Sequence, residues 1–349
     1  MLRAMRLSML LLALTCVACT DPDDSPPPRE LTLEATIDES GLSEELSFAI
    51  PEHTRSVTIV AEGAPDALFA LGTFAVGDGT DLVQLPGDPH GPAMQASYQQ
   101  EQIGHMAGQL YQSIRLGTFT HVYPYKPGQI VVAGTGRLRV ASDRPGSVTI
   151  RIVMPEDVAA TVLPLNVYIV SDTLADPITD PFRDELQQIF TRAGITIRID
   201  AIERLTGSPL ARITDFNEPQ ESPTSQSAMI PSLVADRDDD GLDIFLVERL
   251  PSGIAGLSLG TPGPPIRGSY YFGVIIRGDY PAYELARVMA HEVSHFLALH
   301  HVQNRGVSGQ LYSDPLDDTM PGQDNLMEDG TALSAGQAFA LTRSALLVP

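Results

Sequence analysis

The sequence predicts two folded parts: an all-β sandwich or jelly roll, then an α+β domain with a mixed sheet and a long helix packed on it. Short alternating runs between turn residues fill residues 31–158, whereas strand and helix patterns alternate over residues 162–349. The chain has 349 residues, more than one average domain. Its hydrophobic fraction of 43% is sufficient for sizeable cores and excludes a wholly disordered chain.

The N-terminus has the pattern of an export signal. Two arginines precede a short apolar run, Leu7 to Val17, which is about half of the ~20 residues needed to span a bilayer. The segment Thr15 to Cys19 (TCVAC) resembles a bacterial lipobox, which implies lipidation of Cys19. We therefore expect a signal peptide over residues 1–18 and an acidic, proline-rich lipidated tether over residues 19–30. The expected location is the cell envelope (outer membrane or cell surface), and secretion after simple cleavage is the alternative.

The charge balance excludes several kinds of partner. The chain carries 44 acidic and 22 basic residues, a net charge of −22, whereas nucleic-acid affinity comes largely from Lys and Arg. Lys126 is the only lysine, which excludes polybasic docking on anionic lipid, so membrane contact is expected through the lipid anchor only. Cys16 and Cys19 are the only cysteines, so the folded part has no disulfide and no thiolate metal ligand. We expect a monomer.

The first part, residues 31–158, reads as strands with one buried face. Period-two alternation bounded by Gly, Pro and Asp predicts strands at Leu46–Ile50, Ser56–Val60, Gln129–Val132, Arg137–Val140 and Ser147–Val153. Four scattered histidines lack ligand spacing, and we interpret them as ordinary surface or turn residues: His53, His90, His105 and His121.

The second part, residues 162–349, mixes strands with helices. Apolar runs predict strands at Leu165–Val170, Ile195–Ile202, Asp243–Glu248 and Tyr270–Ile276. A helix is expected over 180–193, with Asp180 as N-cap, Pro181 at its first position and Gly194 ending it. Residues 205–233 are expected to be irregular with one short helix. A long helix is expected from Tyr283 to Leu299.

The segment from His291 to His301 (HEVSHFLALHH) contains four of the eight histidines of the chain. His291 and His295 are four residues apart, so both imidazoles lie on one helix face and suit a tetrahedral zinc ion. Glu292 is rotated by about 100° from His291 and can act as a general base on a water. One straight helix cannot supply a third ligand as well, so the chain must turn before reaching His300 or His301.

The spacing of His291, His295 and His301 resembles the metzincin signature HExxHxxGxxH. In that family the glycine lets the helix end and turns the third histidine onto the metal. Ala298 occupies the glycine position here, and a left-handed turn at alanine costs on the order of 1 kcal/mol. The resemblance favours His301 over His300 as the third ligand.

The downstream sequence is similar to pappalysin-like metzincins. Met327 stands where the family carries a methionine turn beneath the zinc, and a final helix capped by Ser334 is expected over 334–343. In that family the strand before the active-site strand forms the upper cleft rim and pairs with the substrate, a position matched by Gly256–Leu259. Glu328 is the runner-up third ligand, by analogy with thermolysin-like enzymes, but the histidine offset and Met327 argue against it.

The resemblance implies a metzincin-like catalytic domain, Zn²⁺ as cofactor and a protein or peptide substrate. The implied activity is that of a metalloendopeptidase, in which Glu292 is the general base on a zinc-activated water. Asp329 stands where several metzincins place a tyrosine that stabilises the oxyanion. Asp329 and Ala298 motivate the alternative, a catalytically degenerate, surface-anchored binding lipoprotein whose β-sandwich recognises a ligand.

An acidic loop, DRDDDGLD, precedes one of the predicted strands. Alternating carboxylates ahead of a glycine resemble the first half of a calcium loop, and the candidate Ca²⁺ ligands are Asp236, Asp238, Asp240 and Asp243. Glu248 comes one residue too late for a complete EF-hand, and a solvated acidic turn is the equal alternative. The calcium site of pappalysin-like enzymes would here involve Asp314, Asp317 and Asp318.

Overall fold

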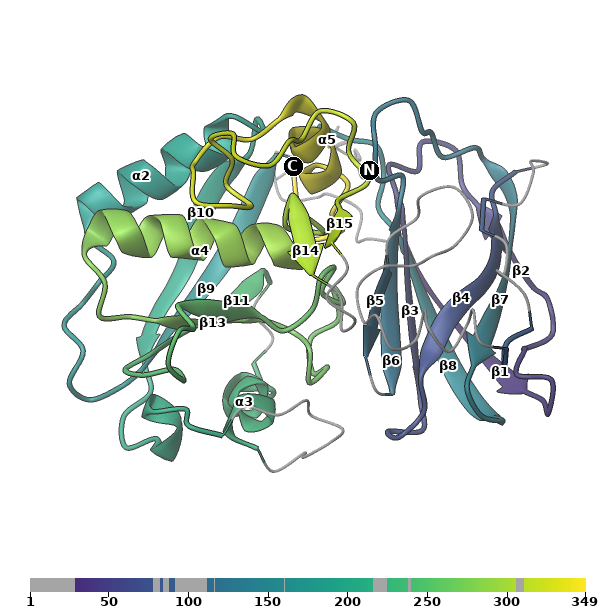
Figure 1. Ribbon diagram of the computed structural model, residues 1–349, viewed down its shortest axis with the longest axis horizontal. Helices are drawn as coiled ribbons and strands as arrows, with labels where there is room; N and C mark the ends of the chain where they lie inside the picture. Colours follow the sequence, from purple (N-terminus) through teal and green to yellow (C-terminus); the bar gives the residue numbers. More distant parts are fainter. Residues whose placement is uncertain are drawn as a thin grey trace, which may run out of the picture.

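The computed structural model describes residues 29–77, 82–83, 88–91, 112–115, 117–159, 161–215, 225–237, 240–305 and 311–349. The predicted signal peptide, Cys19 and nearly all of the predicted tether lie outside these residues, as do His105 and Asp238. Figure 1 shows two units side by side, one built of strands alone and one in which helices pack on a sheet. Among the described residues, no helix is long and apolar enough to cross a membrane.

The N-terminal unit is a β-sandwich. One sheet has the order β1-β8-β3-β6-β5 and the other β2-β7-β4, and all neighbouring strands are antiparallel. Buried residues of both sheets, among them Ile59, Phe119, Phe48 and Leu138, form one core, as predicted for this β-rich part. The strands are β1 Arg29–Ile37, β2 Leu46–Ile50, β3 Val57–Gly63, β4 Phe69–Ala75, β5 Gln112–Arg115, β6 Thr118–Tyr123, β7 Gly134–Ser142 and β8 Gly146–Met154.

One predicted strand of the sandwich is wrong. Residues 129–132 are irregular, and Ile130 is 68% exposed. The hydroxyl of Tyr123 donates a hydrogen bond to the carbonyl of Ile130 at 3.0 Å, in place of a ladder partner. Residues 129–132 therefore alternate like a strand but pair with no strand among the described residues. The alternation alone was not sufficient to predict a strand here.

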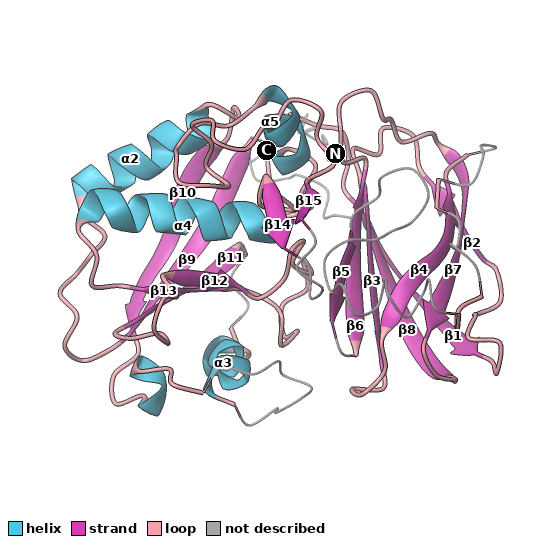
Figure 2. Cartoon of the chain, viewed as in Figure 1, coloured by secondary structure: helices cyan, strands magenta, loops and turns pink. Residues whose placement is uncertain are grey.

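The C-terminal unit is built on a mixed five-stranded sheet of order β10-β9-β11-β13-β12 (Figure 2). Only the edge strand β12 runs antiparallel to its neighbour. These strands are β9 Val162–Val170, β10 Thr196–Arg204, β11 Leu242–Val247, β12 Gly256–Ser258 and β13 Val274–Arg277. The mixed sheet with a long helix agrees with the predicted α+β architecture.

Helices cover both faces of this sheet. The helices α2 Asp180–Thr191 and α4 Ala282–Phe296 share a core with one face. The other face is covered by two 3₁₀ helices, η1 Pro209–Ala211 and η2 Ile230–Val234, and by the short α3 Gln226–Met229. The pair β14 Gln303–Arg305 and β15 Leu311–Ser313 and the helix α5 Ala335–Leu341 follow α4. Val348 pairs with Val162 through two backbone hydrogen bonds of 2.9 Å, so the last residues return to the start of β9.

Several predicted boundaries need correction. The N-cap of α2 is Thr179, and Asp180 is already helical, while Gly194 does terminate this segment with φ +71°. The strand expected from residue 270 begins only at Val274, because residues 269–272 form a turn closed by a hydrogen bond between the Phe272 N–H and the Ser269 carbonyl. The long helix α4 ends at Phe296, earlier than its apolar pattern suggests.

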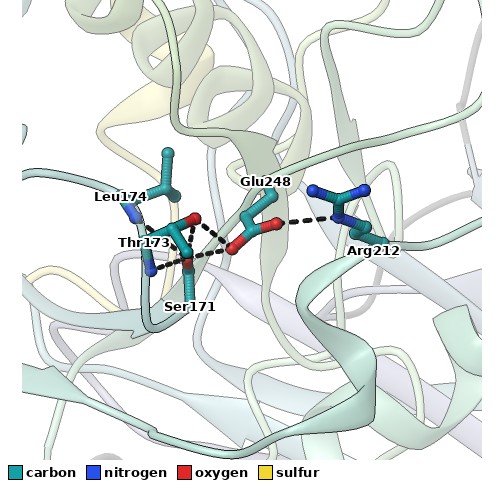
Figure 3. Close-up of polar contacts among 5 residues, drawn as sticks. All are labelled: Ser171, Thr173, Leu174, Arg212 and Glu248. Carbon is teal, nitrogen blue, oxygen red and sulfur yellow. Dashed lines mark hydrogen bonds and ion pairs between the residues drawn. The ribbon is translucent and has the colours of Figure 1, made fainter.

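Glu248 holds together the segments that follow β9 and β11 (Figure 3). One carboxylate oxygen accepts hydrogen bonds from the hydroxyls of Ser171 at 2.6 Å and Thr173 at 2.5 Å, and the other accepts from Arg212 Nε at 2.8 Å. The hydrogen bonds from Ser171, Thr173 and Arg212 lower the pKa of Glu248 to about 2. Glu248 is therefore ionised, and both of its carboxylate oxygens accept hydrogen bonds from neighbouring residues.

Candidate metal centre

The helix α4 is positioned by its apolar face. Leu285, Met289 and Val293 recur at helical spacing and are fully buried in the core between α4, α2 and the sheet. Burial of this stripe fixes the rotation of α4 and places His291 and His295 together on its last two turns.

Three histidine side chains meet at one point. The Nε2 atom of His301 lies 3.1 Å from the Nε2 atom of His291 and 3.1 Å from that of His295. All three ligand atoms lie within 4.8 Å of one another. Tetrahedral ligands at about 2.0–2.1 Å from zinc are roughly 3.3 Å apart, so the spacing fits a zinc ion held by three imidazoles.

The opposite ring nitrogens fix the tautomers of two of these histidines. His291 Nδ1 lies 2.6 Å from the carbonyl oxygen of Leu326, and His295 Nδ1 lies 2.7 Å from that of Leu299. Because a carbonyl only accepts, each Nδ1 carries the proton and each Nε2 presents its lone pair to the shared point. Burial lowers the pKa of His291 to about 4 and that of His295 well below its usual value, so both are neutral at pH 7. Two converging lone pairs are stabilised by a cation between them.

A left-handed residue turns the chain from α4 to the third histidine. Ala298 has φ +107°, and around it the N–H of Leu299 donates to the carbonyl of Ser294 at 2.8 Å. The turn was predicted from the glycine position of the family signature. It brings His301 to the other two histidines, whereas the rival His300 is buried with its ring 6.4 Å from that of Tyr125.

Ala298→Gly is expected to stabilise the protein by about 0.5–1 kcal/mol, because glycine adopts a positive φ without the Cβ clash. The free energy of unfolding from denaturant titration measures this. The same change at Ala338, inside α5, is the control and is expected to cost roughly 0.5–1 kcal/mol. If both changes destabilise equally, Ala298 carries no conformational strain.

The side chain of Glu292 extends from α4 toward the edge strand β12. Its Oε2 atom accepts a hydrogen bond of 2.9 Å from the backbone N–H of Ser258. A Cβ on Gly256 would lie 2.6 Å from the Cγ atom of Glu292, so the absence of a side chain at Gly256 makes room for the carboxylate. Burial raises the pKa of Glu292 to about 7, with the Ser258 hydrogen bond opposing it. A base with a pKa near the working pH is suited to proton transfer.

The predicted methionine turn lies under the histidines. Met327 is fully buried, and the neighbouring Leu326 provides the carbonyl that accepts from the first histidine. Asn325 accepts from the N–H of Met327 at 2.9 Å and exchanges two side-chain hydrogen bonds of 3.0 Å with Gln337. Gln337 also closes a capping box with Ser334 at the start of α5, so the turn and the final helix form one unit.

The roles of three residues at this centre were not predicted. Gln337 had a visible signal, the Ser-x-x-Gln spacing of a capping box from Ser334. Ser258 acts through a backbone N–H and Gly256 through a missing side chain, and neither contribution leaves a pattern in one sequence. Their signal is the position of β12, which was expected at 256–259 and is found at 256–258.

The other candidate ligands lie elsewhere. Glu328 accepts a hydrogen bond of 3.0 Å from the N–H of Gly322, and within the described residues the metal-ligating group contains the three histidines alone. The charge of Asp329 raises the pKa of His291, against the larger lowering by burial.

One residue of the predicted calcium loop is paired within the protein. Asp243 is almost fully buried, and its two carboxylate oxygens pair with Arg267 at 3.0 and 2.9 Å. Asn166 donates to the carbonyl of Asp240 at 2.8 Å and to Asp243 at 3.3 Å. Asp243 is therefore part of a buried ion pair with Arg267, and its assignment as a calcium ligand stays a prediction. Asp238 lies outside the described residues.

Carboxylates of the acidic segment before the methionine turn also accept hydrogen bonds from within the protein. Asp318 accepts from the hydroxyl of Ser334 at 2.9 Å and from the N–H of Gly336 at 2.7 Å, at the start of α5. Asp314 accepts from the hydroxyl of Thr319 and the N–H of Leu316. Asp318 therefore connects this segment to the start of α5, whereas Asp314 stabilises a turn within the segment.

A surface cavity of about 490 Å³ lies away from the histidines. Arg212, Glu248 and Arg277 are among its lining residues, and it follows the carboxyl ends of β11 and β13. Neither Glu292 nor any of the three histidines lines it, so it is not part of the metal centre.

Comparisons with known proteins give no family assignment. No family model and no curated protein matches the sequence. The structure is similar to metalloproteinase-II from Bacteroides fragilis, with 15% identity over 83% of this chain and 86% of that chain and a TM-score of 0.30. A family two carbohydrate esterase from Cellvibrio japonicus has 7% identity over 63% of this chain and 68% of that chain, with a TM-score of 0.14. These low similarities leave the three-histidine group and its surroundings as the basis for a function.

Proposed function

We propose that this protein is a zinc-dependent endopeptidase of the metzincin type, with His291, His295 and His301 as the metal ligands. The observation that carries the proposal is the meeting of three Nε2 atoms, with His301 Nε2 lying 3.1 Å from each of the other two, next to the helix that also carries Glu292. Three protein ligands that leave a fourth position open are typical of catalytic zinc sites, whereas structural zinc sites have four.

Each residue around the centre has a separate role in the proposed hydrolysis. Zinc, when bound there, would polarise a peptide carbonyl and lower the pKa of water toward ~7. The N–H of Ser258 holds Glu292 Oε2, which leaves Oε1, beside Gly256, to take a proton from water. The same carboxyl group can return that proton to the leaving amine. The carbonyls of Leu326 and Leu299 keep two ligands in the correct tautomer throughout.

The edge strand β12 supports a peptide as the substrate. β12 pairs with β13 on one side and is the last strand of its sheet. An extended peptide can add to such an edge through main-chain hydrogen bonds. Because Glu292 contacts Gly256 and Ser258 of the same strand, a peptide added there would pass the general base.

We further propose that the protein is an exported lipoprotein of the cell envelope, attached through Cys19 and active as a monomer. Growth with labelled palmitate tests this, and a Cys19→Ser variant is expected to lose the label. Nothing in the described residues adds support for calcium, which is not part of the proposal.

The proposed function is tested by the zinc content of the purified protein and by its hydrolysis of a denatured protein. One zinc per chain with hydrolysis that a chelator abolishes and added zinc restores is the expected result. One zinc without hydrolysis would favour the alternative, a degenerate binding lipoprotein. A protein that binds no zinc would contradict the assignment of the histidines.

A further inference from the structure

The third ligand depends on a segment that no helix holds. His291 and His295 are fixed by the burial of α4, but His301 follows the turn at Ala298 and stands before β14. Its position is therefore set by what packs around residues 297–302. Leu299 and Val302 of this segment are fully buried in the core shared with α4.

His300, the residue next to the third ligand, packs against the β-sandwich. The His300 side chain is 1% exposed, and its ring centroid lies 6.4 Å from that of Tyr125, with the planes at 54°. This is within the range of contacting aromatic pairs, about 4.5–7 Å. His301 lies instead against the other two ligands, so the two adjacent rings have different neighbours.

Tyr125 lies in the sequence of the β-sandwich, but its side chain packs in the core of the C-terminal unit. It follows β6, and its N–H donates to the side-chain oxygen of Gln129 at 2.8 Å. Its side chain is 2% exposed and is buried in the same core as α4 and Met327, not in the sandwich core. A residue of the first unit thus completes the core behind the metal centre.

The boundary between the units is held at a second place. Arg55, which is 5% exposed, donates from Nη2 to the carbonyls of Ser344 at 3.0 Å and Leu347 at 3.2 Å. These carbonyls belong to the segment after α5, whose Val348 pairs with β9. The Tyr125–His300 contact and the hydrogen bonds of Arg55 are therefore two separate buried contacts between the units. Figure 1 shows β5 and β6 on the side of the sandwich that faces β14 and β15.

We infer that the β-sandwich positions the third metal ligand, with Tyr125 as the positioning residue that acts on His301 through His300. The sandwich is then a permanent part of the metalloprotein and not a segment that can be removed from an active enzyme. This inference rests on the proposed zinc centre. Residues that hold a ligand without touching the metal commonly contribute about 10–100-fold to metal affinity.

The test is the zinc affinity of the full chain, measured by competition with a chromophoric chelator. Tyr125→Leu, which removes the ring, is expected to weaken zinc binding by about 10–100-fold, and Tyr125→Phe is expected to retain it. Phe74→Leu is the matched control, because Phe74 is fully buried in the sandwich core. It is expected to lower stability and leave zinc affinity within about 2-fold. Tyr125→Met, which keeps the apolar volume, replaces the leucine variant if that variant does not fold.

The outcomes separate this inference from the proposed function. An unchanged zinc affinity in Tyr125→Leu, with zinc bound by the original protein, overturns the positioning role alone. Equal losses in Tyr125→Leu and Phe74→Leu also overturn it, because the effect would then follow general stability. Absence of zinc from the original protein contradicts the proposed function itself. The absorption of the Co²⁺-substituted protein gives a second readout, and a changed ligand-field band in Tyr125→Leu alone supports a displaced ligand.

Discussion

Glu292→Gln is expected to lower peptide hydrolysis by about 10²–10⁴-fold and to leave one zinc bound, because the amide keeps the shape of the side chain but cannot take a proton. Glutamine can still accept the hydrogen bond from the N–H of Ser258 through its carbonyl oxygen, so the side chain keeps its place beside Gly256. Steady-state hydrolysis of a denatured protein and zinc content, measured on the same preparations, check both parts.

The matched control is Glu284→Gln, which removes a carboxylate from the first turn of the same helix. It is expected to change hydrolysis by less than about 3-fold, because Glu284 has no part in the proton transfer. Hydrolysis retained by Glu292→Gln at the original rate would contradict the assignment of the general base.

His301→Ala is expected to weaken zinc binding by more than about 100-fold and to abolish hydrolysis with it, because only two ligands remain. Loss of a ligand should exceed the loss from a residue that only supports one. Isothermal titration with Zn²⁺ after removal of bound metal measures the affinity.

Glu328→Gln distinguishes the two candidate third ligands. Glu328 binds the N–H of Gly322 and not the histidine group, so its variant is expected to keep zinc and hydrolysis. The reverse result, zinc lost in Glu328→Gln and kept in His301→Ala, would assign the third ligand to the carboxylate.

Sequence patterns predicted those features of the protein that are determined by residues close to one another in the sequence. The spacing of the apolar residues of α4 and the four-residue interval between His291 and His295 both follow from helix geometry. The turn at Ala298 was predicted only through a family signature, since alanine itself has no preference for a positive φ.

Contacts between distant segments could not be predicted. Asp243 has the sequence surroundings of a calcium ligand, and only the fold brings Arg267 to it. Residues 129–132 alternate like a strand, but the pattern does not say whether a partner edge exists. Tyr125 looks like any tyrosine in a β-rich segment, and its burial behind the histidines depends on how the two units pack. Such contacts are properties of the tertiary structure.

The pairing of Val348 with Val162 joins two segments that are synthesised at different times. The chain is synthesised from its N-terminus, so the partner of Val162 is made long after Val162 itself. The carbonyl of Leu326 and the side chain of Gln337, which support the centre, are also made after the histidines. A chain made only as far as His301 therefore carries all three histidines of the metal centre but lacks the carbonyl of Leu326 that orients His291. The proposed peptidase activity is therefore expected only after residues 326–337 have been synthesised and have folded against the histidines.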